Sequence, residues 1–215
     1  MSSDLFHTIR QIVRQEMARY RSAELAVVQE IHPHADEGDE DNYACTVVLR
    51  NSGIVLERVP VATARPGLAA IPPSGSLVLV HFLGGDVNAP VIQGAFYNDE
   101  DRPPPNADGQ WVLHLPLGAA EDEAVQAVVS SGEARSLSLK LGAGLEIDLQ
   151  DDDPVVRLLV DGDKVTLQID RDGTVNLETQ SELKIKADSV TMEGTNIEIN
   201  ADTELILRGG VVNIN

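Results

Sequence analysis

Two closely spaced histidines are the first residues in this chain whose types and spacing could support chemistry. His32 and His34 are separated by one proline, so in an extended strand both imidazoles would point to one side and could bind a metal ion. The pair adjoins the acidic run HADEGDED, whose composition is typical of a turn. A solvated loop is therefore the better interpretation, and we predict no metal site here.

Four carboxylates in the C-terminal half form a second candidate, and they are Asp161, Asp163, Asp170 and Asp172. Their spacing does not fit an EF-hand loop, and an alternation of apolar side chains continues through them. Turns between strands explain these residues better than calcium binding does. Weak cation binding where several chains meet stays open as the alternative.

A third candidate is the glycine-rich corner in VHFLGGDVNAPVIQGAFYN, residues 80–98. A phosphate-binding loop would be followed by a helix whose N-terminus faces the anion, but here a second strand pattern follows. The two adjacent glycines are expected to supply positive φ in a tight turn, with the aspartate capping backbone amides. We predict a purely structural turn made by Gly84, Gly85, Asp86, Pro90 and Gly94.

Catalytic motifs are missing from the sequence. No Gly-x-Ser-x-Gly occurs, and Cys45 has no basic neighbour in sequence that would activate it. His81 lies near Ser76 and Asp86, but nothing beyond proximity makes them a nucleophile site. We therefore predict that the protein is not an enzyme and has no catalytic residue, cofactor or metal ion.

Composition argues against several function classes. The 215 residues carry a formal charge of -19, which repels nucleic-acid backbones and anionic lipid headgroups. Hydrophobic residues make up 42% of the chain, enough for a core, whereas aromatic residues make up only 3%, which disfavours stacking platforms for ligands. A single cysteine allows no intrachain disulfide, and neither a signal-peptide core nor a membrane-spanning apolar run is present.

Residues 1–24 are predicted to form a separate N-terminal helix. Apolar side chains recur there at helical spacing, at Leu5, Ile9, Ile12, Val13 and Met17. The segment has four basic and three acidic residues, net +1, while the remaining 191 residues have 12 basic and 32 acidic, net -20. Its apolar stripe needs a cover, which is either the chain's own domain or another protein.

Residues 25–100 alternate strand and turn signals. Five candidate strands, LAVVQEI, YACTVVLR, IVLERVPVA, LVLVHFL and PVIQGAFY, predict a small oligonucleotide/oligosaccharide-binding (OB) barrel, with a compact sandwich as the alternative. Residues 101–135 are assigned to a proline-rich linker and a transition segment. Within that segment, the part after residue 110 begins like a strand and is then open between a loop with a short helix and another hairpin.

Residues 136–215 show the most regular pattern. Short segments with alternating apolar side chains begin every seven to ten residues, as in a β-solenoid or long prism. At about 25 cal/mol per Å² of buried apolar surface, such narrow stripes would barely offset roughly 1.5 kcal/mol of ordering entropy per residue in a lone chain. Three identical chains wound about one axis would cover the stripes. The expected fold class is all-β: an N-terminal helix, an OB-fold barrel and a C-terminal intertwined trimeric β-helix.

The segment VPVATARPGLAAIPPSGSLVLVHFLGGDVNAPVIQGAFYN resembles the OB domain of phage baseplate assembly protein V, the central spike of contractile tails. The matching features are a Val-Pro-Val strand end at 59–61, Gly67, the Pro-x-x-Gly of 72–75, Phe82, Gly84-Gly85-Asp86, Pro90 and Gly94. The likeness spans roughly residues 25–100. The repetitive C-terminal part is similar to that family's trimeric needle and to the spike part of type VI secretion proteins.

This resemblance implies a non-catalytic homotrimer at the baseplate centre of a phage virion or phage-like particle, assembled in the bacterial cytoplasm. The needle would contact the target membrane transiently while it punctures the envelope. The resemblance also implies a separate hub protein. We expect the N-terminal helix to dock on this hub through Leu5, Ile9, Ile12, Arg10 and Arg14.

A needle that ends in strands would expose apolar side chains and unpaired backbone groups at its tip. Some members of the family bind iron there through a His-x-His, but this chain has no histidine after His114. The resemblance instead implies a PAAR-repeat protein as cap, on Leu205, Leu207, Val211, Val212 and Ile214. The alternative function is an OB-type module that binds oligosaccharide or nucleic acid on a trimeric stalk. Three basic against ten acidic residues in 25–100 disfavour it.

Overall fold

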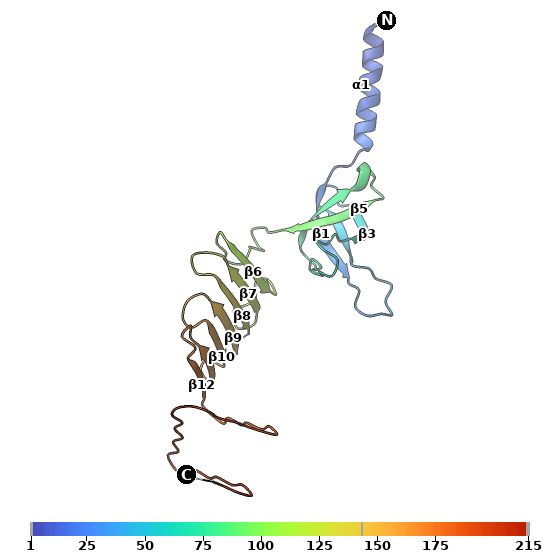
Figure 1. The fold of residues 1–215 in the computed structure, drawn as a ribbon. Helices are drawn as coiled ribbons and strands as arrows, with labels where there is room; N and C mark the ends of the chain where they lie inside the picture. Colours follow the sequence, from blue (N-terminus) through green and yellow to red (C-terminus); the bar gives the residue numbers. More distant parts are fainter. Residues whose placement is uncertain (1, 143, 214–215) are drawn as a thin grey trace.

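The described residues form one α-helix, one short 3-10 turn and two antiparallel sheets (Figure 1). The computed structural model describes residues 2–142 and 144–213, and within the helix the side chains of residues 5–15. Helix α1 (Ser2–Arg19) contains no glycine or proline, and it extends away from the first sheet. The chain is therefore mostly β, as the sequence predicted.

The first sheet contains β1 (Glu24–His32), β2 (Ala44–Leu49), β3 (Val55–Pro60), β4 (Leu77–Phe82) and β5 (Pro90–Phe96). Its strand order is β3-β2-β1-β4-β5, and the two edge strands curve toward each other. Val61 and Ile92 form a parallel bridge, and the amide of Ala62 donates a hydrogen bond of 2.8 Å to the carbonyl oxygen of Ile92. The five strands match the five segments that the sequence pattern predicted.

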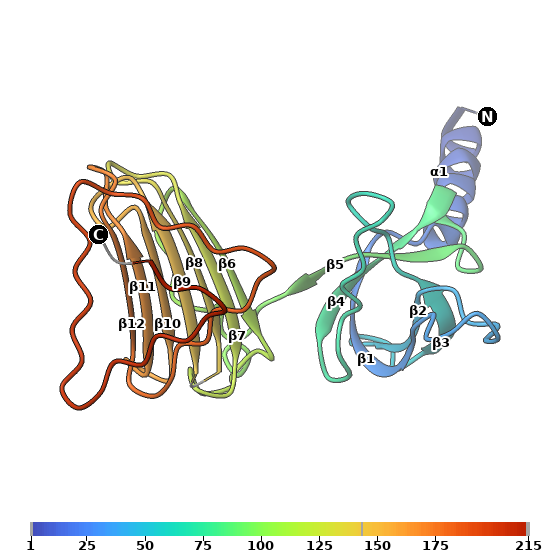
Figure 2. The ribbon, with the colours of Figure 1, turned by 60° about the horizontal axis from the view of Figure 1, so that its bottom comes forward.

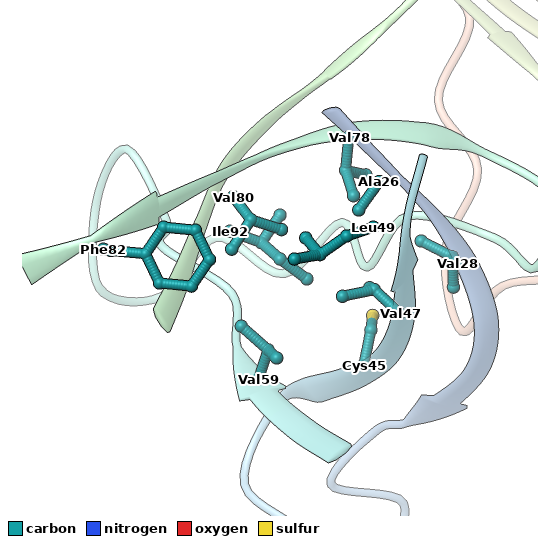
Figure 3. Close-up of a cluster of buried hydrophobic side chains, with 10 residues drawn as sticks. All are labelled: Ala26, Val28, Cys45, Val47, Leu49, Val59, Val78, Val80, Phe82 and Ile92. Atoms are coloured by element: carbon teal, nitrogen blue, oxygen red, sulfur yellow. The ribbon is translucent and has the colours of Figure 1, made fainter. Parts of the chain in front are cut away.

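Alternating side chains of the first sheet form the chain's main buried core. In β4, and in β2 from Cys45 to Leu49, every second side chain is buried and the residues between are partly exposed, because successive side chains point to opposite faces of a sheet. Figure 3 shows the ten residues of this core, which are Ala26, Val28, Cys45, Val47, Leu49, Val59, Val78, Val80, Phe82 and Ile92.

The second sheet is a meander in which each strand pairs with the next one in sequence. Its strands are β6 (Gln110–Leu115), β7 (Val125–Ser130), β8 (Ser136–Leu141), β9 (Leu145–Gln150), β10 (Val156–Val160), β11 (Val165–Ile169) and β12 (Val175–Thr179). The first two lie in the segment that the sequence left open, where the hairpin alternative is the one observed. No helix lies against either face of this sheet (Figures 1 and 2).

The segment after β12 has a sequence that predicted further strands, at 182–188, 189–194, 196–202 and 204–210. That prediction is wrong for the single chain, because no described residue from 180 to 213 belongs to a strand. A strand requires a neighbouring backbone as hydrogen-bond partner, and these residues extend as two long arms away from the meander (Figure 1). The last predicted strand, 211–215, includes residues 214 and 215, which lie outside the described residues.

Candidate functional site

The second sheet has one continuous apolar face. Directly opposed residues in an antiparallel pair point to the same side, so the register of six successive pairs aligns three rows of side chains. The rows are Trp111, Val129, Leu137, Leu149, Val156, Ile169 and Val175; Leu113, Ala127, Leu139, Ile147, Leu158, Leu167 and Leu177; and Leu115, Val125, Leu141, Leu145, Val160, Val165 and Thr179. All of these except Thr179 are apolar, and we refer to them together as the apolar sheet face.

The opposite face of the same sheet is mainly polar. One of its rows is Val112, Val128, Ser138, Asp148, Arg157, Gln168 and Asn176, and another is His114, Gln126, Lys140, Glu146, Leu159, Thr166 and Glu178. Lys140 and Glu146 pair across strands over 3.5 Å. The sheet is therefore two-sided in character, with one face suited to water and one that requires a cover.

Nothing in the described part of the chain supplies that cover. Trp111 and Val175, at the two ends of one row, are each 60% exposed, and Leu177 is 51% exposed. After residue 100, only Ala124 and Ala127 are buried apolar residues among those described. A contiguous exposed apolar surface of this extent marks an interaction surface.

The predicted tip-cap residues lie on the C-terminal arm and are exposed. Leu205 is 54% exposed and Leu207 is 61% exposed, and the values for Val211 and Val212 are 79% and 50%. Ile214 lies outside the described residues. The described part of this C-terminal segment thus presents apolar side chains and pairs with no described strand.

The predicted hub-docking residues are likewise exposed on α1. Leu5, Ile9 and Ile12 are 62%, 47% and 53% exposed, and Arg10 and Arg14 are also exposed. The side chain of Met17 lies outside the described residues. The helix therefore leaves its apolar side chains uncovered, as the second sheet does.

Tyr20 and Arg21, which connect α1 to β1, contact the end of β4 and the β4–β5 connection. The sequence analysis did not predict these contacts. The Tyr20 ring packs on Gly85, and the amide of Arg21 donates a hydrogen bond of 3.1 Å to the Gly85 carbonyl oxygen. The Arg21 guanidinium lies 5.9 Å from the centre of the Phe82 ring and 3.1 Å from a Glu24 carboxylate oxygen. The Tyr20-Arg21 pair, shortly before the first strand, is the sequence feature from which these contacts could have been predicted.

The glycine-rich corner is a tight connection between two strands. A short 3-10 turn, η1 (Leu83–Gly85), follows β4, and Gly84 and Gly85 have φ values of 63° and 80°. The Asp86 carboxylate accepts a hydrogen bond of 2.9 Å from the amide of Asn88. Of the remaining predicted turn residues, Pro90 begins β5 and Gly94 pairs with Leu79. No helix follows, so the corner has no phosphate-binding geometry.

The two histidines near the N-terminus occupy different environments. His32 is buried at the end of β1, where its Nε2 lies 2.9 Å from Thr46 Oγ1, so placing both histidines in a solvated loop was wrong for this residue. His34 is exposed, and its Nδ1 lies 2.9 Å from Asp39 Oδ1. No group of three or more potential metal ligands occurs among the described residues.

Asp39 organises the loop between β1 and β2. Its carboxylate accepts hydrogen bonds from the backbone amides of Ala35, Asp36 and Asp41 and from His34. The His34 hydrogen bond, followed by these amides, lowers the pKa of Asp39 to about 2. The same contact raises the pKa of His34. The acidic run is thus a structured turn.

The four C-terminal aspartates lie in hairpin turns of the second sheet. Asp161 pairs with Lys164 over 2.9 Å, and Asp172 accepts a hydrogen bond of 2.8 Å from the Thr174 amide. The side chains of Asp163 and Asp170 are bonded to glutamine amides. These local partners agree with the turn interpretation.

A groove of about 500 Å³ lies between β3 and the β4–β5 connection. Its walls include Val55, Arg58, Leu83 and Val87, and it contains no cysteine or histidine. The Arg58 guanidinium is paired with Asp41. Cys45 is buried in the core, where burial raises the pKa of its thiol, so it is unsuited to act as a nucleophile.

No protein-family model and no curated protein sequence matches this chain. No described helix is both long enough and apolar enough to cross a membrane.

Proposed function

We propose that this chain is a non-catalytic structural protein, the homotrimeric central spike of a contractile tail or a phage-like injection particle. The observation that carries the proposal is the apolar sheet face, which is continuous over seven strands and has no cover within the described chain. Copies of the same chain are the simplest cover, because each brings an identical apolar face to the shared axis. The resulting shaft would have a dry core inside and a polar surface outside.

The C-terminal arms support the same arrangement. Segments such as 196–202 keep strand-like alternation, yet they pair with no strand among the described residues. In an intertwined β-helix, neighbouring chains would supply these hydrogen bonds, and the apolar side chains would turn toward the axis. Such a needle would be stiff, because every strand would be paired and its core would be close-packed.

The first sheet fits the OB-fold barrel of this proposal. Its order β3-β2-β1-β4-β5, together with the bridge between Val61 and Ile92, supports a five-stranded barrel closed between β3 and β5. The sequence resemblance to baseplate spikes covers this same region, and it supplies the number of three chains. A separate hub protein, a PAAR-repeat cap at the arm and transient contact with a target membrane complete the proposal.

A measurement of absolute mass in solution tests the proposed homotrimer directly. Three chains of 23.1 kDa give about 69 kDa, and light scattering should find that value even at high dilution. A folded single chain whose second sheet is protected from hydrogen exchange would contradict the proposal. In that case the apolar sheet face would not need a partner.

The groove beside β3 favours a second candidate, an OB-type binding module for oligosaccharide or nucleic acid. OB barrels commonly bind ligands over strands 2 and 3 and the connection between strands 4 and 5, and two of these parts, β3 and the β4–β5 connection, line this groove. The excess of ten acidic over three basic residues in 25–100 argues against nucleic acid. Binding of a single-stranded oligonucleotide or an oligosaccharide at low salt, lost on mutation of Arg58, would favour this candidate.

A further inference from the structure

Helix α1 has an apolar stripe that faces solvent over residues 5–15, the part of the helix whose side chains the structure describes. Leu5 is 62% exposed, Phe6 is 66% exposed and Val13 is 49% exposed. The helix stands away from the first sheet (Figure 1), and in proteins most of the stability of a helix comes from packing of its apolar face rather than from intrinsic propensity. The stripe therefore requires a partner outside its own barrel.

We propose that the α1 helices of three copies pack against one another as a short parallel three-helix bundle. This inference rests on the proposed trimer, and it adds a second contact between the same three chains. The partner of each helix is thus another copy of this chain, and the contact begins at the barrel and continues toward the N-terminus.

The spacing of the apolar residues in α1 favours packing against the α1 helices of other copies of the chain. Leu5, Ile9 and Ile12 fall at successive d, a and d positions of a heptad, which is the seam of a coiled coil. Isoleucine at both a and d favours three or more strands over two. Phe6 and Val13 both fall at e, and apolar residues at a, d and e form the wider face of helices in a bundle.

The two arginines agree with the same register. Arg10 falls at b and Arg14 at f, so both would point away from the axis of the bundle. This arrangement narrows the hub-docking prediction, because the apolar residues would be covered by sister helices. Only the arginines on the outside would remain available to a hub protein.

The base of the helix supports a parallel arrangement. The Tyr20 ring lies on Gly85, and the Arg21 amide is bonded to the Gly85 carbonyl oxygen, so the chain leaves each barrel in a defined direction. In a threefold assembly, three barrels related by rotation would then direct their helices to the same side. The seam is short, since the next a position is Glu16, and the bundle would depend on the contacts made elsewhere in the trimer.

Cysteine crosslinking in the full-length chain tests the bundle. Ile9→Cys places a thiol at the seam, and Gln11→Cys places one at position c, on the far side of the same helix. Cys45 is fully buried and stays shielded in the folded protein. After mild oxidation, about two thirds of the Ile9→Cys chains should run as a covalent dimer, since two of the three thiols around the axis can pair. The Gln11→Cys protein should give several-fold less dimer.

Light scattering on both variants separates this inference from the proposed function. If the mass is that of three chains and Ile9→Cys gives no more dimer than Gln11→Cys, the bundle is overturned while the spike stands. If both variants have the mass of one chain, the trimer itself is refuted and the bundle with it.

Discussion

Tyr20 lies so close to Gly85 that a Cβ atom at position 85 would be 2.2 Å from Cδ2 of the tyrosine ring. The contact joins the residue after α1 to the connection between β4 and β5. Gly85 also has a φ of 80°, a left-handed conformation that side chains disfavour. Position 85 therefore requires glycine for two reasons: its backbone has a positive φ, and the Tyr20 ring leaves no space for a Cβ atom.

Gly85→Ala should destabilise the protein more than Gly84→Ala. Both glycines have positive φ, so each alanine should cost roughly 1–2 kcal/mol from the backbone alone. Only at position 85 must the Tyr20 ring also move, since no heavy atom lies within 4 Å of a Cβ built at position 84. Thermal unfolding of both variants measures the difference. Equal melting temperatures would show that the Tyr20 contact contributes nothing.

Leu167→Glu should break the proposed assembly, whereas Gln168→Glu should leave it intact. The two residues are neighbours in β11, but Leu167 lies on the apolar sheet face and Gln168 on the polar face. Gln168→Glu loses the hydrogen bond to the Asp170 carboxylate, but it leaves the apolar sheet face unchanged. A carboxylate buried without a partner, together with the lost apolar packing, should cost several kcal/mol per chain. Sedimentation of both variants gives the readout. A Leu167→Glu protein that keeps the mass of three chains would refute the buried face.

The loop between β1 and β2 should be most ordered at mildly acidic pH. The hydrogen bond from His34 is the main cause that lowers the pKa of Asp39 from 3.8 to about 2, so this contribution is present above about pH 4 and is lost as pH falls toward 2. The pKa of His34 is raised from 6.5, so its contribution is present below pH 6.5 and is lost as pH rises through the raised value. Protection of the Ala35 and Asp36 amides from hydrogen exchange should therefore decrease both as the pH falls toward 2 and as it rises through the raised pKa of His34.

Asp39→Asn should remove that protection, because a neutral amide is a weaker acceptor and no longer attracts protonated His34. Glu37→Gln removes one charge from the same loop and serves as the control. If the two variants show equal amide protection, Asp39 does not organise the loop.

Deletion of residues 205–215 should abolish binding of a PAAR-repeat cap while leaving the rest of the chain folded. The deleted segment carries the exposed Leu205, Leu207, Val211 and Val212, whereas the second sheet ends at Thr179. A pull-down with the purified cap protein provides the measurement. Undiminished capture by the truncated chain would reject the tip-cap prediction.

The pattern of apolar residues along the sequence was sufficient to predict most of the strands. The alternation in segments such as 136–141 and 165–169 depends only on neighbouring residues in sequence, so it can be read before any fold is known. The glycine-rich corner was predictable for the same reason, because positive φ and Asp86 capping are local properties.

Burial of His32 was not predictable from sequence. The residue follows a strand pattern and precedes a proline, and only the tertiary structure buries its imidazole within hydrogen-bonding distance of the Thr46 hydroxyl. The segment that forms β7 was ambiguous because 116–124, which precedes it, has no apolar period of its own. Its antiparallel pairing with β6 and β8 was decided only in the folded sheet.

The sequence by itself determined where strands and turns can form, because apolar alternation and turn residues act within a few positions along the chain. It also determined that apolar side chains alternate with polar ones in short segments between residues 136 and 212. Only the tertiary structure decided which of these segments find a partner within the chain, because hydrogen bonds between strands and the packing of side-chain faces depend on distant residues. The first sheet closes around its own core, whereas the apolar sheet face and the C-terminal arms are left uncovered.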